Sequence, residues 1–122
     1  MKTEIGLWID WQKATIIVAS DAQEEVREIL SHAATKPSRK LFRVKDQYYN
    51  RVIAQIRRAT SVLIFGPDEA KAELQCRLQE REPSDRKVNV ETGYDMNPRQ
   101  IMTRVRSYFR PGEVTASAPR AV

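Results

Sequence analysis

Residues 5–19 read IGLWIDWQKATIIVA, and this stretch decides the fold. Residues 5–9 and 14–19 are short, apolar and rich in β-branched side chains, and the polar stretch DWQK separates them, so they predict two antiparallel strands joined by a turn. Neither strand alternates polar and apolar residues as a half-buried strand does. We therefore expect both strands to lie inside a sheet that is covered on both faces.

The rest of the chain predicts one further antiparallel strand and then alternating helices and strands. Residues 26–31 alternate apolar and charged side chains weakly, which is typical of an edge strand. After them the apolar spacing becomes helical, and Asp46 is the expected N-cap of the first helix. The later expected elements are a buried strand at 61–65, a helix with Ala70, Leu74 and Leu78 on its inner face, a strand at 87–91, and a helix that begins at Asn97-Pro98 and ends before Pro111.

This order of elements predicts an α/β fold with a ribonuclease-H-like mixed five-stranded sheet. Right-handed crossovers place the two later strands parallel to the first, which gives the strand order 3-2-1-4-5 with three helices, in the sequence β-β-β-α-β-α-β-α. Residues 1–110 form the expected domain. Residues 111–122 have little to bury and are expected to be a flexible C-terminal tail.

The composition narrows the class of protein. The chain has 122 residues, 41% of them hydrophobic and 30% charged, as expected for one globular domain. One cysteine and one histidine leave no internal disulfide and no Cys/His zinc site. The chain begins without an apolar leader and contains no run of about 18 apolar residues. We therefore expect a cytoplasmic protein that does not associate with a membrane.

The charge is concentrated in one segment. The chain holds 21 Lys and Arg against 16 Asp and Glu, a net charge of +5, and residues 32–45 contain five cations and no acid. Such a segment, with an aromatic residue nearby, is typical of RNA binders, although many basic runs are only solvated surface. Trp11 could stack on a base, support a partner protein or cover the end of the sheet. The predicted RNA-binding residues are Lys36, Arg39, Lys40, Arg43, Lys45 and Trp11.

Two other functions stay open at this point. Asp10, Asp68 and Glu91 or Asp95 follow strands that should end at one edge of the sheet, where a metal-dependent nuclease would hold its ions. The same acids suit turns and first helical turns, so we assign no catalytic residue, no metal ligand and no cofactor. The other alternative is a protein-interaction module or homodimer that pairs through the third strand's edge or through Trp11.

Residues 9–16, IDWQKATI, and 63–71, LIFGPDEAK, resemble the central domain of the archaeal and eukaryotic peptide release factor and Pelota family, including its bacterial relatives. In that family an apolar strand ends in Asp, an Ala-x-Ile strand follows, and a later strand runs into Gly-Pro-Gly-x-x-Lys at the start of a helix. The match in element order covers residues 4–109. The resemblance implies a fold of the translation machinery and a ribosomal or structured-RNA partner.

The chain departs from this family in ways that bear on activity. Release factors hydrolyse peptidyl-tRNA through a Gly-Gly-Gln tip, and this chain has no adjacent glycines. Asp68 stands at the third position of the glycine motif. The resemblance covers only the central domain, so we expect no flanking stop-codon-reading or partner-binding domains. We therefore expect a non-enzymatic, translation-associated protein that binds RNA or the ribosome through its basic loop, closer to the Pelota-like members.

Overall fold

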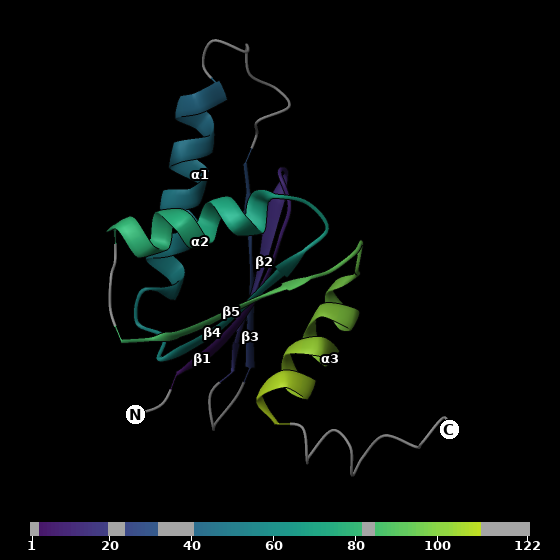
Figure 1. Ribbon diagram of the computed structural model, residues 1–122. Helices are drawn as coiled ribbons and strands as arrows, with labels where there is room; N and C mark the ends of the chain where they lie inside the picture. The colour runs from purple at the N-terminus through teal and green to yellow at the C-terminus, as the bar shows by residue number, and fades with distance from the viewer. Residues whose placement is uncertain (1–2, 20–23, 32–40, 82–84, 111–122) are drawn as a thin grey trace.

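The five strands and three helices follow one another in the predicted order (Figure 1). The structure is a computed structural model, which describes residues 3–19, 24–31, 41–81 and 85–110, with the side chains of α1 described from Lys45 onward. The expected tail, residues 111–122, lies outside these ranges. The elements are β1 (Glu4–Ile9), β2 (Lys13–Ala19), β3 (Glu24–Leu30), α1 (Leu41–Ile56), β4 (Ser61–Gly66), α2 (Ala70–Arg81), β5 (Lys87–Thr92) and α3 (Pro98–Phe109).

The strands form one mixed sheet in the order β3-β2-β1-β4-β5, which confirms the prediction. β1 pairs antiparallel with β2 and parallel with β4, so the first strand of the chain is also the central one. β5 runs parallel to β4 on the far side. The carboxyl ends of β1, β4 and β5 therefore lie at the same end of the sheet, which is also where the β1–β2 turn lies.

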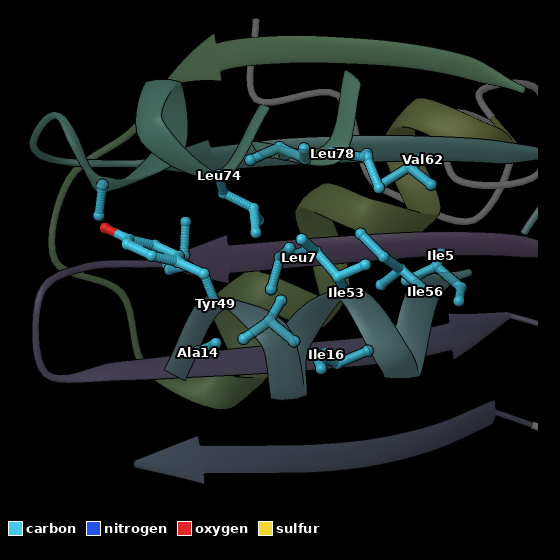
Figure 2. Close-up of a cluster of buried hydrophobic side chains, with 14 of the residues drawn as sticks. Ile5, Leu7, Ala14, Ile16, Tyr49, Ile53, Ile56, Val62, Leu74 and Leu78 are labelled. Atoms are coloured by element: carbon cyan, nitrogen blue, oxygen red, sulfur yellow. The ribbon is translucent and has the colours of Figure 1, made fainter. Parts of the chain in front are cut away.

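One face of the sheet is covered by α1 and α2 (Figure 1). Alternate residues of β1, including Ile5 and Leu7, point to this face and contact Ile53 of α1 and Leu74 of α2 within one buried cluster (Figure 2). The predicted helical stripes are confirmed, because each of their members is buried: Tyr49, Val52, Ile53 and Ile56 in α1, and Ala70, Leu74 and Leu78 in α2.

The opposite face is covered by α3, through a smaller cluster that contains Trp8 of β1 and Ile101 and Val105 of α3. Trp8 is 1% exposed, which confirms that it belongs to the core. α3 begins after Asn97 as the sequence predicts, and the structure adds a capping box there. Gln100 N–H donates to the Asn97 side chain at 2.8 Å, and Asn97 N–H donates to Gln100 Oε1 at 2.9 Å.

The start of α1 differs from the prediction. The helix begins at Leu41, five residues before Asp46, so Asp46 lies inside the helix and is not its N-cap. Residues 41–45 contain no Gly or Pro, and Leu41 and Val44 extend the 3-to-4-residue apolar spacing that leads to Tyr48. That spacing was the signal for the earlier start.

None of the helices in the described ranges is long and apolar enough to cross a bilayer.

β3 is an edge strand, as predicted, and its two faces differ. Ile29 packs against the cluster under α1, and Arg51 of α1 donates to the Leu30 carbonyl at 2.5 Å. Val26 and Leu30 lie on the other face, where they are 46% and 47% exposed. This edge therefore leaves apolar side chains in solvent beyond the cover of α3.

The close contact between β1 and α3 yields a stability prediction. A Cβ atom at Gly6 would overlap the side chain of Val105, so Gly6→Ala is expected to destabilise the fold by about 2 kcal/mol, as overpacking of a core does. Urea unfolding of Gly6→Ala, Val105→Ala and the double variant measures the effect. Because Val105→Ala removes part of the overlap, the double variant should lose less stability than the sum of the single losses. Strictly additive losses would contradict this contact.

Candidate functional site

The turn between β1 and β2 is held rigidly by hydrogen bonds. The Asp10 carboxylate accepts from Gln12 N–H and Lys13 N–H, both at 2.8 Å. The Tyr48 hydroxyl of α1 donates to the Asp10 carbonyl at 2.9 Å. Ser31, just after β3, donates through Oγ to the Trp11 carbonyl at 2.7 Å and through N–H to the Gln12 carbonyl at 2.8 Å. Three consecutive carbonyls thus have partners from other elements, so the backbone that bears Trp11 is fixed.

Trp11 is half-buried at this end of the sheet. Its ring packs against the core cluster under α1, and the Nζ atom of Lys45 lies 4.3 Å from the ring centroid. This distance is that of a cation–π interaction. Trp11 therefore covers the end of the sheet, which was one of its three predicted roles, and it also places one predicted RNA-binding cation.

The structure brings together two of the six predicted binding residues, Trp11 and Lys45. Arg43 lies in α1 and not in a loop, and its side chain is not among those described. Lys36, Arg39 and Lys40 lie outside the described residues, so their contribution stays a prediction. The ends of the segment that contains them are described, however. Ser31, which precedes the segment, and Lys45, its last residue, both contact the Trp11 turn.

A clamp between α1 and α2 fixes the helix that follows the basic segment. Asp46 accepts from Arg77 Nη1 and Arg81 Nη2 of α2, both at 2.7 Å. Tyr49 donates to Glu73 Oε2 at 2.9 Å, and the Arg77 guanidinium lies 4.7 Å from the Tyr49 ring centroid. The hydrogen bond from Arg81 holds the pKa of the Asp46 carboxyl below its usual value, and the Arg77 charge adds to this effect.

The acids of the nuclease alternative have structural partners. Asp10 closes the turn, Asp68 Oδ1 accepts from Ala70 N–H at 3.0 Å at the start of α2, and Glu91 pairs with Arg104 of α3. Asp95 lines an open hollow of about 400 Å³ together with Asp10. Within the described ranges, no three His, Cys, Asp or Glu residues are grouped so that they could hold a metal ion.

Gly66, at the end of β4, is required because the ends of β4 and β1 approach each other closely. A Cβ atom at Gly66 would overlap the Ile9 carbonyl oxygen, so a side chain there would force β4 away from β1. Gly66 also accepts from Gly93 N–H at 2.8 Å, which ties β5 to the same point. Asp68, which departs from the family motif, caps α2 through its side chain.

Sequence reasoning missed Ser31 and Tyr48, which fix the Trp11 turn. Both hydrogen-bond to residues that are distant along the chain, 20 and 38 positions away, so no local pattern shows them. A buried tyrosine whose hydroxyl needs a partner was the one available signal for Tyr48.

Solved structures with the same architecture include two Pelota proteins and an archaeal translation termination factor. Pelota from Archaeoglobus fulgidus superimposes with a TM-score of 0.64 at 16% identity, over 93% of this chain and 33% of that protein. Pelota from Thermoplasma acidophilum gives 0.60 at 14% identity, over 93% and 34%. The archaeal translation termination factor aRF1 gives 0.53 at 17% identity, over 86% and 33%.

The chain has a Pelota-like fold. This confirms the fold that the two short motifs implied, and the chain spans about a third of the length of each of these structures. No family model matches the chain, and no curated protein matches its sequence. At 14–17% identity the likeness concerns the arrangement of elements, while the residues at the site are this chain's own.

The clamp at Asp46 yields a pH prediction. Because the pKa of Asp46 is lowered in the folded state, its contribution to stability is complete above its ordinary value of about 4 and is lost as the pH falls through the lowered value. Asp46→Asn should lower the free energy of unfolding at pH 7 and reduce its decline between about pH 4 and pH 2. Urea unfolding across this range measures both effects. The exposed Asp85→Asn is the control, and a profile for Asp46→Asn that matches the control would contradict the clamp.

Proposed function

We propose that this chain is a non-catalytic, translation-associated protein that binds ribosomal or other structured RNA through its basic segment, residues 32–45, together with Trp11. The geometry of the Trp11 turn carries the proposal. Ser31 precedes the segment and Lys45 ends it, and both contact the turn. Both described residues therefore lie at a rigid end of the sheet, which suits a surface that must meet a large partner.

The charge of the segment favours a phosphate-rich ligand. The segment carries a charge of +5 on its five cations, which equals the net charge of the whole chain, and no acid lies between them in the sequence. Lys45, the one whose side chain is described, lies on the aromatic ring of Trp11, and among the described residues it forms no ion pair with a carboxylate. A cation held in this way keeps its full charge available to phosphate, and neutralising phosphates releases condensed counterions, which makes binding strongly salt-dependent.

The fold supports a role in translation. One of the similar structures is an archaeal translation termination factor, and the release factor and Pelota family is the one that the motifs resemble. The absence of adjacent glycines argues against a Gly-Gly-Gln tip, and the acids at the strand ends serve turns and caps. These observations favour binding without hydrolysis, in the cytoplasm where ribosomes work.

Co-sedimentation with ribosomes tests the proposal. Arg39→Glu/Lys40→Glu is expected to abolish co-sedimentation, because it places two acids where phosphates should bind. The matched control is Arg58→Glu/Lys87→Glu, which alters exposed cations at the other end of the sheet. Each double reversal changes the net charge by four units, from +5 to +1. Equal loss in both variants would mean that only total charge matters, and no loss in the first would overturn the proposed site.

Self-association through β3 is a second candidate, which the exposure of Val26 and Leu30 on an edge strand favours. Two copies that pair along this edge would bury both side chains and extend the sheet. Val26→Lys should then shift a dimer to monomer in gel filtration with light scattering. Asn89→Lys, on the opposite edge strand β5, adds the same charge and should leave the dimer intact. A wild-type chain that stays monomeric at high concentration rules this candidate out.

A further inference from the structure

The Tyr94 side chain is exposed to solvent, while its main chain is held by hydrogen bonds. Its side chain is 65% exposed, more than any other large hydrophobic residue of the described ranges. Its carbonyl nevertheless accepts from Trp8 Nε1 at 2.9 Å, and the preceding Gly93 N–H donates to the Gly66 carbonyl at 2.8 Å. The main chain is thus tied to the core on both sides of the ring. The ring itself buries little, so packing in the described fold does not account for an aromatic residue here.

The Tyr94 ring lines an open groove of about 460 Å³ along α3, together with Met96, Arg99, Thr103 and Arg104. Arg104 is held in place, because it pairs with Glu91 and its guanidinium lies 6.0 Å from the Tyr108 ring. Arg99 is exposed, and its carbonyl accepts from Thr103 Oγ1 at 3.0 Å within the helix. The groove thus offers one flat aromatic face, a thioether and two guanidinium groups.

These groups fit a ligand that is both flat and anionic. An aromatic side chain stacks on a nucleobase of any type, and a nearby arginine binds the adjoining phosphate. We propose that the Tyr94 groove binds an unpaired nucleotide of single-stranded RNA, with the base on the Tyr94 ring and the phosphate at Arg99. Bases inside a duplex are stacked on one another and hide their faces, so the groove should discriminate against paired RNA.

The groove lies beside the turn that carries Trp11. Met96 lines both this groove and the smaller hollow whose wall includes Gln12 and Lys13 of that turn, together with Asp10 and Asp95. The RNA character of the ligand rests on the proposed function, whereas the position of the stacking site rests on Tyr94 and its groove.

Fluorescence anisotropy with the whole chain and a labelled ten-nucleotide single-stranded RNA of mixed sequence tests the inference. Tyr94→Ala should weaken binding about fivefold or more, the loss expected when one stacked base loses its partner, and Tyr94→Phe should bind within about twofold of wild type. Binding of a blunt duplex of the same sequence should be unchanged in both variants. Arg99→Glu should weaken binding of the single strand more than Arg58→Glu does, because Arg58 lies at the opposite end of the sheet.

A photo-crosslink locates the contact directly. The same RNA with 4-thiouridine at each position in turn should crosslink to the peptide that contains Tyr94, and circular dichroism should show that Tyr94→Ala keeps the fold. Unchanged affinity in Tyr94→Ala, or an equal loss in Tyr94→Phe, overturns the stacking site.

The outcome for ribosome binding separates this inference from the proposed function. A wild-type chain that sediments with ribosomes but does not bind the single strand overturns the groove and leaves the proposed function standing. Binding of the single strand that depends on Tyr94 but not on Arg39 and Lys40 supports the groove and counts against the basic segment. A chain that binds neither ligand overturns both.

Discussion

β1 must bury both of its faces, and the arrangement of the other elements follows from this constraint. Ile5, Leu7 and Ile9 need a cover on one side of the sheet, and Trp8 needs one on the other. Between β2 and β4, the backbone of β1 forms hydrogen bonds on both of its edges. The helices on the two faces of the sheet bury its side chains. α3 can approach closely because Gly6 leaves room for Val105.

The same strand connects the core to the surfaces proposed for binding. At its carboxyl end, β1 passes into the turn that carries Trp11, and Tyr48 of α1 holds the carbonyl of Asp10 there. On the other face, the indole N–H of Trp8 holds the carbonyl of Tyr94. The Trp11 ring and the Tyr94 ring, which are partly and largely exposed, thus both belong to main-chain segments that are hydrogen-bonded to core residues. Rigid mounting reduces the entropy lost when a flexible ligand is bound.

The chain shares its fold with Pelota and aRF1 although few of their residues are identical. The arrangement of strands is shared at 14–17% identity. In this chain it depends on strands that bury both faces and on a few close approaches, such as Gly66 against Ile9. Surface groups are under no such constraint, so the basic segment, Trp11 and Tyr94 must be judged by their own chemistry.

The sequence by itself determined the sheet order, the two-sided cover and the core stripes, because these depend on local periodicity and on general rules for crossover connections. It also located the basic segment and the start of α3 at Asn97. It placed the start of α1 too late, because Asp46 matches an N-cap in isolation and its two arginine partners come from a helix more than 30 residues away.

Only the tertiary structure decided which side chains meet. Lys45 and Trp11 lie far apart in the sequence, and they come together because α1 packs against the β1–β2 turn. Trp8 and Tyr94 are also far apart, and they meet because β1 and β5 end at the same edge of the sheet. The partners of Asp10, Asp68 and Glu91 were likewise decided there, since a carboxylate at a strand end can serve a turn, a cap or an ion pair equally well until its neighbours are placed. Local patterns fix the elements of a chain, and long-range packing fixes their contacts.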